Sequence, residues 1–173
     1  MNKQFTFMRP TPGKQQGATL IIALVFMVAL TLLGATAAQN SGLEERMSSN
    51  TRNRDLAFQA AEAALKYVQL NLSSGDNLRS QNYSGSTAGY RTYNATLADD
   101  ATYWGTTFVW SDATAKHPAD TIAGVASQPY YIVEKMPNVG AVEYYRVTAR
   151  GVGGDANAVV ILQAAYSYNP SSP

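Results

Sequence analysis

The chain has 173 residues, no cysteine, and a nearly balanced charge of 13 basic and 12 acidic side chains. A chain without cysteine has no disulfide framework, no thiolate metal site and no cysteine nucleophile. Because it lacks the basic excess that binding to a phosphate backbone requires, nucleic acid is not expected as the main partner.

The first predicted element is an apolar helix over residues 18–38, a stretch with no charged side chain. Its length is sufficient to cross the roughly 30 Å hydrocarbon layer of a bilayer. Its polar side chains are threonines, whose hydroxyls can bond back to the helix backbone. Lys3, Arg9 and Lys14 precede the segment and the first acidic residue is Glu44, so the positive-inside rule predicts a cytoplasmic N-terminus.

Three interpretations of this segment remain open. Ala35-Thr36-Ala37 follows Gly34 and has the small-x-small form of a signal-peptidase site, so cleavage after Ala37 would release a periplasmic binding protein. The second interpretation keeps the whole segment as an uncleaved membrane anchor. In the third interpretation, the sequence immediately before the apolar run is itself a processing signal.

That preceding sequence, KQQG at residues 14–17 followed by ATLII at residues 18–22, resembles the type III signal of type IV prepilins. The resemblance implies that residues 1–17 form a leader, and that a prepilin peptidase/methylase cuts between Gly17 and Ala18 and methylates Ala18. Such a cut leaves the apolar helix on the mature protein as its assembly interface. The large apolar side chains expected there are Leu20, Ile22, Leu24, Phe26, Leu30 and Leu33.

Residues 39–74 are predicted to continue the same helix in amphipathic form. Apolar residues recur there at spacings of three and four, which is the period of one helix face. They are Leu43, Met47, Ala57, Ala60, Ala61, Ala64, Leu65, Val68 and Leu72. Ser73-Ser74-Gly75 supplies a stop signal.

The sequence GLEERMSSNTRNRDLAFQAAEAAL at residues 42–65 resembles the corresponding region of PilX-like minor pilins of type IV pili. PYYIVEKM at residues 129–136 and the run at residues 145–166 resemble the C-terminal sheet of the same group. The resemblance implies a non-enzymatic subunit, without cofactors, that helps to initiate pilus assembly in a priming or tip complex. The K-type minor pseudopilin of type II secretion is the nearest rival assignment.

The same resemblance implies the partners and the location. The partners would be other minor pilins, the major pilin, the prepilin peptidase/methylase, the inner-membrane assembly machinery and a large tip adhesin. The chain would cross the bacterial inner membrane once, with its C-terminal domain in the periplasm, and would lie in the pilus after assembly.

Ile22 departs from the pilin pattern. Most pilins of the family carry glutamate at the fifth position of the mature chain, where it is thought to neutralise the N-terminal ammonium of a neighbouring subunit. An unpaired ammonium buried among apolar helices costs several kcal/mol. A subunit without this glutamate docks poorly behind another, so Ile22 favours a first position in the assembly over an abundant shaft position.

Charged residues follow the apolar segment, and they are candidates for ion pairs between subunits. Exposed pairs of this kind contribute little stability each, so they would select register and partner. The candidate residues are Glu44, Glu45, Arg46 and Arg54, together with Arg52 and Asp55.

Residues 75–173 are predicted to form a globular domain with an antiparallel sheet of about four strands, laid on the second half of the helix in an α+β pilin fold. Strand candidates lie at residues 90–97, 106–110, 130–134, 143–150 and 157–166. The glycine-rich sequence at residues 151–155 joins the last two strand candidates as a hairpin. Alternation predicts Tyr145, Val147 and Ala149 on the packed face, with Tyr144, Arg146, Thr148 and Arg150 facing water.

No catalytic or metal-binding constellation emerges from the sequence. His117 is the single histidine and is expected to be a solvated loop residue. Asp99, Asp100, Asp112 and Asp120 match no calcium-loop spacing and are interpreted as solubilising. Tyr103, Trp104 and Trp110 are expected in the core, with an exposed aromatic patch as the alternative. We therefore predict no enzyme activity, no cofactor and no metal.

Overall fold

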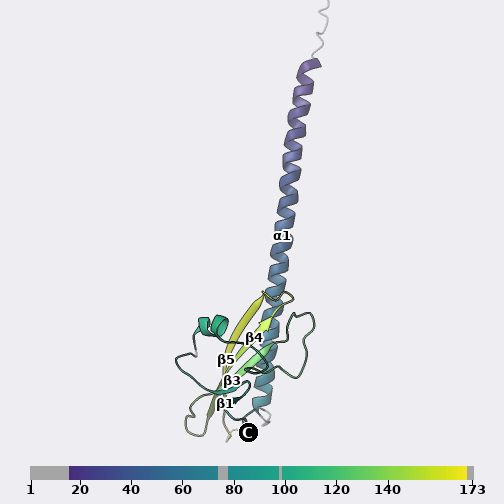
Figure 1. Cartoon of the computed structure of the whole chain (residues 1–173). Helices are drawn as coiled ribbons and strands as arrows, with labels where there is room; N and C mark the ends of the chain where they lie inside the picture. Colours follow the sequence, from purple (N-terminus) through teal and green to yellow (C-terminus); the bar gives the residue numbers. More distant parts are fainter. Residues whose placement is uncertain (1–15, 74–77, 98, 171–173) are drawn as a thin grey trace, which may run out of the picture. The chain divides into compact units, whose positions relative to one another are not determined.

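The computed structural model describes residues 16–73, 78–97 and 99–170. Its elements, in chain order, are α1 (Gln16–Ser73), β1 (Ser84–Thr87), β2 (Tyr90–Thr92), the π-helix η1 (Tyr103–Thr107), β3 (Tyr130–Lys135), β4 (Glu143–Val152) and β5 (Val159–Tyr168) (Figure 1). The chain divides into two compact units between Arg46 and Met47, and each is described by itself. Of the predicted leader, only the last two residues are among those described.

The first unit contains the N-terminal part of α1, in which every side chain from Ala18 to Arg46 is exposed. Two threonines bond back to the helix as predicted. The Thr31 hydroxyl donates to the Val28 carbonyl at 2.8 Å, and the Thr36 hydroxyl donates to the Leu33 carbonyl at 2.9 Å. These bonds satisfy the polar groups of an otherwise apolar helix within the helix itself.

The second unit contains the remainder of α1, which presents an apolar stripe to the sheet. The fully buried members of the stripe are Ala57, Ala60, Ala61, Ala64 and Val68, and Leu72 closes it at 4% exposure. The predicted stripe was too long, because Leu43 and Met47 are 58% and 70% exposed. Apolar periodicity therefore continues upstream of the residues that the sheet covers.

The five strands form one sheet in the order β1-β2-β3-β4-β5. β2 and β3 pair in parallel, whereas the other neighbours are antiparallel. The α+β pilin architecture is confirmed, with one strand more than expected and one parallel pair. The candidate strand at residues 90–97 ends at Thr92, and β1 was not predicted.

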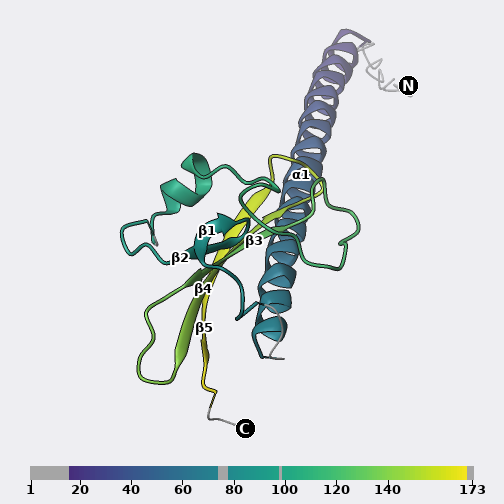
Figure 2. The ribbon, with the colours of Figure 1, turned by 60° about the horizontal axis from the view of Figure 1, so that its bottom comes forward.

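One face of the sheet packs on α1, as both ribbon views show for the second unit (Figures 1 and 2). Tyr145, Val147 and Ala149 on β4 are fully buried there against the alanine stripe, as the alternation predicts. Tyr131 and Val133 on β3 extend the same cluster. Burying a side chain of this size contributes about 1.5–3 kcal/mol, so this layer supplies much of the stability of the second unit.

The opposite face of the sheet was predicted to be wet, and this prediction was wrong. Arg146 is 7% exposed and Thr148 is fully buried. The segment around η1 covers this face through Trp104, which clusters with Ala115 and Ile132. The sheet is thus packed on both sides.

The predicted strand at residues 106–110 is instead the end of η1 followed by an extended stretch. The Asp100 carboxylate accepts backbone N–H bonds from Thr102 and Tyr103, at 2.8 and 3.1 Å, and so starts the helical turn. The Trp110 indole donates to the Trp104 carbonyl at 3.0 Å. The Asp100 cap and the Trp110 hydrogen bond therefore hold this turn, and Trp104 is a core residue as expected.

Gly153 and Gly154 lie in the predicted hairpin between β4 and β5, and Gly153 and the β4 residue Gly151 allow close packing on α1. A Cβ atom at Gly151 would lie 2.0 Å from the Ala57 carbonyl oxygen, and one at Gly153 would lie 2.1 Å from the Asn53 carbonyl oxygen. Only hydrogen fits at these positions, because real Cβ atoms do not approach backbone so closely. Gly151 and Gly153 therefore determine how closely the sheet approaches the helix.

Candidate assembly surfaces

The predicted interface residues of the apolar segment are all exposed. Leu20, Ile22, Leu24, Phe26, Leu30 and Leu33 are between 55% and 72% exposed. α1 is long and apolar enough to cross a membrane, judged by length and composition. The segment thus fits a transmembrane anchor and offers side chains that the first unit does not cover.

Residues 18–38 carry no carboxylate or ammonium side chain, and the first acid on α1 is Glu44. At the position where the resemblance predicts a glutamate, Ile22 places a 55% exposed alkyl side chain. No side chain of this segment can therefore pair with a cation from a neighbouring chain.

The predicted inter-subunit charges Glu44, Glu45, Arg46 and Arg54 are exposed on α1. Glu44, Glu45 and Arg46 belong to the first unit, and Arg54 belongs to the second. Arg54 lies with Asn50 and Asn53 on one wall of a groove of about 470 Å³, and the hairpin supplies the other wall with Asp155 and Asn157. Because these charged side chains are exposed, they are accessible to a partner subunit.

A buried cluster of charged residues, which the sequence did not predict, lies on the outer face of the sheet. Glu134 is 1% exposed and lies 3.6 Å from the Arg91 Nε and 3.5 Å from the Arg146 Nε. Arg146 also donates to the exposed Asp99 carboxylate at 2.8 Å. Two guanidinium groups thus flank one buried carboxylate, and one of them ties the segment that leads into η1 to the sheet.

Burial and ion pairing act in opposite directions on the carboxylates of this sheet. Burial raises the pKa of Glu134 above its ordinary value, while the positive charges of Arg91 and Arg146 oppose that rise. At the end of β4, the hydrogen bond from Lys135 lowers the pKa of Glu143, and a second bond from the Tyr145 hydroxyl acts in the same direction. The two glutamates therefore respond oppositely to acid.

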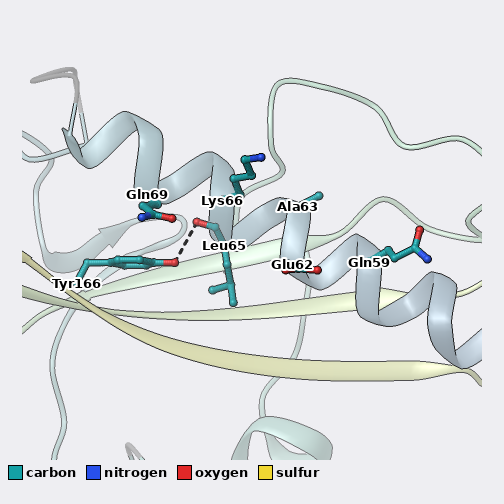
Figure 3. A pocket seen from close by; sticks show the side chains of 7 residues that line it. All are labelled: Gln59, Glu62, Ala63, Leu65, Lys66, Gln69 and Tyr166. Atoms are coloured by element: carbon teal, nitrogen blue, oxygen red, sulfur yellow. Dashed lines mark hydrogen bonds between the residues drawn. The ribbon is translucent and has the colours of Figure 1, made fainter.

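A groove of about 540 Å³ lies along the second unit between α1 and β5 (Figure 3). Its helix wall is formed by Gln59, Glu62, Ala63, Leu65, Lys66 and Gln69. On the strand side, Tyr166 reaches across and its hydroxyl donates to the Leu65 carbonyl at 3.4 Å. Glu62 and Lys66 bring opposite charges to the same wall, so the groove is close to neutral.

His117, the single histidine, contacts the neighbouring side chains of Tyr130 and Asp112. His117 is an exposed loop residue, as expected, and its ring stacks on that of Tyr130 with centroids 4.0 Å apart. Its Nδ1 lies 2.8 Å from the Pro129 carbonyl and its Nε2 lies 3.1 Å from Asp112. Within residues 16–73, 78–97 and 99–170, no three histidine, aspartate or glutamate side chains meet in a way that could hold a metal ion.

Sequence reasoning missed the buried charges and the packing glycines for identifiable reasons. Arg146 and Asp99 are 47 residues apart in the chain, and their pairing has no local signal. Gly151 lies inside β4, but the sequence analysis assigned it to the hairpin, so the close backbone approach that a glycine within a strand indicates was not predicted.

Two family models match the chain. One, described as PilX N-terminal, matches residues 16–66, and the other, described as type IV pilus assembly protein PilX C-term, matches residues 80–168. No curated protein and no solved structure matches the chain. The first match contains the exposed apolar segment and the alanine stripe, and the second contains every strand of the sheet. The chain therefore belongs to the PilX family of type IV pilus assembly proteins and is a PilX-like minor pilin.

Proposed function

We propose that this minor pilin helps to initiate type IV pilus assembly as a member of a priming complex at the pilus tip. Residues 18–38 would dock among the corresponding helices of other minor pilins, and major pilins would then be added behind them. Membership of the PilX family supports a role in the pilus. The exposure of the large apolar side chains supports docking through the helix.

The observation that carries the tip assignment is the apolar side chain at Ile22. A subunit that enters a helical bundle behind another must accommodate the ammonium group of the subunit ahead. Without a carboxylate in residues 18–38, this chain leaves such an ammonium unpaired, at a cost of several kcal/mol. The first position in the assembly avoids that cost, because no subunit lies ahead.

The proposed biogenesis follows from the same segment. The chain inserts into the inner membrane with its N-terminus in the cytoplasm, is cleaved after Gly17, and is methylated at Ala18. The mature protein then consists of the apolar segment at residues 18–38, the amphipathic half of the helix at residues 39–74, and the globular domain at residues 75–173. Its proposed partners are the other minor pilins, the major pilin, the prepilin peptidase/methylase, the inner-membrane assembly machinery and a large tip adhesin.

The tip assignment is tested by counting epitope-tagged copies along purified pili by immunogold microscopy. The unsubstituted chain should label pilus tips, whereas Ile22→Glu should also label the shaft, because a carboxylate now accepts the ammonium ahead. Ile21→Glu is the matched control: it places the same charge one residue away and should not enter the shaft. Shaft labelling by the unsubstituted chain would contradict the proposal.

Processing is tested by the intact mass and N-terminal sequence of the protein purified from membranes of its own host. An N-methylated Ala18 is the expected result. A mature chain that begins at Ala38 would remove the apolar segment from the assembly and overturn the proposed mechanism.

A further inference from the structure

We propose that the open edge of β5 binds an extended, uncharged segment of another pilus subunit, which joins the sheet as an additional strand. The proposal rests on the proposed function for the source of that segment, since it places the chain among other pilins. The proposed site consists of β5, of α1 beside it, and of the groove between them.

β5 is the last strand of the sheet and pairs with β4 along all ten of its residues. The Gly153 N–H donates to the Ala158 carbonyl at 2.8 Å, which sets the alternation of hydrogen-bonded pairs along the hairpin. It follows that Val160, Leu162 and Ala164 bond to β4. Ile161, Ala165 and Ser167 then direct their backbone N–H and C=O groups away from the sheet.

The sequence of β5 does nothing to block pairing at this edge. VVILQAAYSY contains no charge, no proline and no glycine, whereas natural edge strands are usually short, bulged, charged or interrupted by proline. The opposite edge shows such protection: β1 has four residues, includes Gly85 and has an irregular register with β2. A long, regular, uncharged edge is therefore retained on one side of the sheet only.

The side chains of β5 that face α1 are incompletely covered. Tyr145, Val147 and Ala149 on β4 are fully buried, but their cross-strand partners Tyr166, Ala164 and Leu162 are only half-buried. α1 packs over β4 and leaves the groove of about 540 Å³ beside β5 (Figure 3). A strand paired to β5 would cover this apolar row with alternate side chains of its own.

The groove and the edge together define the chemistry of the occupant. A row of backbone donors and acceptors at strand spacing is matched by an extended polypeptide. The half-buried side chains of Leu162, Ala164 and Tyr166 would be covered best by a segment with apolar side chains at every second position, which is the period of a strand. Glu62 and Lys66 offset each other on the helix wall, so a charged segment would gain no net attraction and would lose solvation.

The first test is amide hydrogen exchange of the full-length protein in two preparations. One is the protein alone in detergent, and the other is the assembly purified from its host through a tag on this chain. We expect the amides of Ile161, Ala165 and Ser167 to exchange at least tenfold more slowly in the assembly. Unchanged exchange at all three amides would overturn the proposal.

The second test blocks the edge by substitution. Ala165→Pro removes an outward N–H and leaves the bonds to β4, so it should abolish the protection and reduce the number of pili at least tenfold. Ala165→Ser keeps the N–H at the same exposed position and should behave as the unsubstituted chain. If Ala165→Pro lowers the melting temperature, Ser167→Lys replaces it as a charged edge substitution, with Ser167→Thr as its control. Normal pilus number with a blocked edge and native melting would overturn strand addition.

Failure of strand addition is distinguishable from failure of the proposed function. If Leu30→Asp blocks pilus formation while the edge variants assemble normally, the priming function stands and the β5 proposal falls. If Leu30→Asp forms pili in normal number, the priming function through the helix falls, whatever the state of β5.

Discussion

α1 contains two apolar stretches, of which the first is exposed and the second is buried by the sheet. Residues 18–38 include eleven large apolar side chains, and all eleven are exposed. Between Ala57 and Ala64, the four alanines Ala57, Ala60, Ala61 and Ala64 are fully buried beneath the sheet. Small side chains let a neighbouring backbone approach the helix, whereas large ones offer area to a membrane or to other helices. The buried alanines thus form the folding surface of this helix, and the exposed large side chains form its candidate assembly surface.

Leu30→Asp should give the largest effect on the number of pili, and it should act on assembly alone. A carboxylate at the centre of an apolar helix costs about 3 kcal/mol in a bilayer, which corresponds to roughly a 100-fold loss of assembled pili. Counting pili by electron microscopy measures the loss, and Leu30→Ile is the control. The melting temperature of the second unit should not change. If Leu30→Asp lowered both the number of pili and the melting temperature of the second unit, the apolar segment at residues 18–38 would also contribute to folding.

Arg146→Met should give the largest loss of folding stability. It leaves the buried Glu134 carboxylate with Arg91 as its remaining ionic partner, and breaking a buried pair in this way costs about 3–5 kcal/mol. Urea unfolding followed by tryptophan fluorescence measures the change, because Trp104 lies in the segment that Arg146 ties to the sheet.

Asp99→Asn is the matched control for Arg146→Met, since it removes the exposed partner and should cost at most about 1 kcal/mol. Replacing Glu134 and Arg146 together by leucine and methionine should recover much of the loss. Equal effects of Arg146→Met and Asp99→Asn would show that the buried pair is not the source of the stability.

Gly151→Ala should destabilise the second unit by about 2–3 kcal/mol, because the added Cβ overlaps the Ala57 carbonyl and forces the sheet away from the helix. Gly42→Ala is the control: it adds the same methyl group where no atom lies within 4 Å, and it should slightly favour the helix. Differential scanning calorimetry distinguishes the two variants. An unchanged melting temperature for Gly151→Ala would mean that helix and sheet tolerate a wider separation.

The smallest expected effect is a change in the pH dependence of folding. The lowered pKa of Glu143 contributes stability above the ordinary glutamate pKa of about 4.3, and that contribution is lost as pH falls through the folded value. The raised pKa of Glu134 acts in the reverse sense: its contribution is complete below about pH 4.3 and is lost as pH rises through the folded value.

Glu143→Gln should therefore flatten the loss of stability on acidification, and Glu134→Gln should not. Urea unfolding of both variants across the acid range measures this difference. Parallel curves for Glu143→Gln and the unsubstituted protein would contradict the assigned pKa direction.

The elements with strong local periodicity could be predicted from the sequence. α1 follows from the spacing of its apolar residues, and β4 and β5 follow from alternation, each within two residues of the observed ends. β1, with the sequence SGST, was missed because it has no apolar residue, and it forms by pairing with β2. The buried state of Arg146 was missed because it depends on Glu134 and Asp99, which only the folded chain brings together.

The candidate assembly surface can be named from the sequence, whereas the covering of the outer face of the sheet cannot. An uncharged apolar run and a charged run beside it are visible in sequence order. The large apolar residues from Leu20 to Leu33 are exposed, and their role as an assembly interface stays a prediction. The covering of the outer sheet face by the aromatic side chains around η1 depends on a segment without regular periodicity. Whether Gly17 is the processing site stays a prediction.

The single parallel pair in the sheet has a consequence for the order of folding. β4 and β5 are joined by a short hairpin, so their pairing needs little loop closure and forms early. β2 and β3 can pair only after the whole stretch from Tyr93 to Pro129 has closed, and this contact is among the most non-local in the sheet. When the full chain refolds, it would thus pass through an interval with its C-terminal hairpin formed and the segment between β2 and β3 still unpacked, when proteases and chaperones have their best access to that segment.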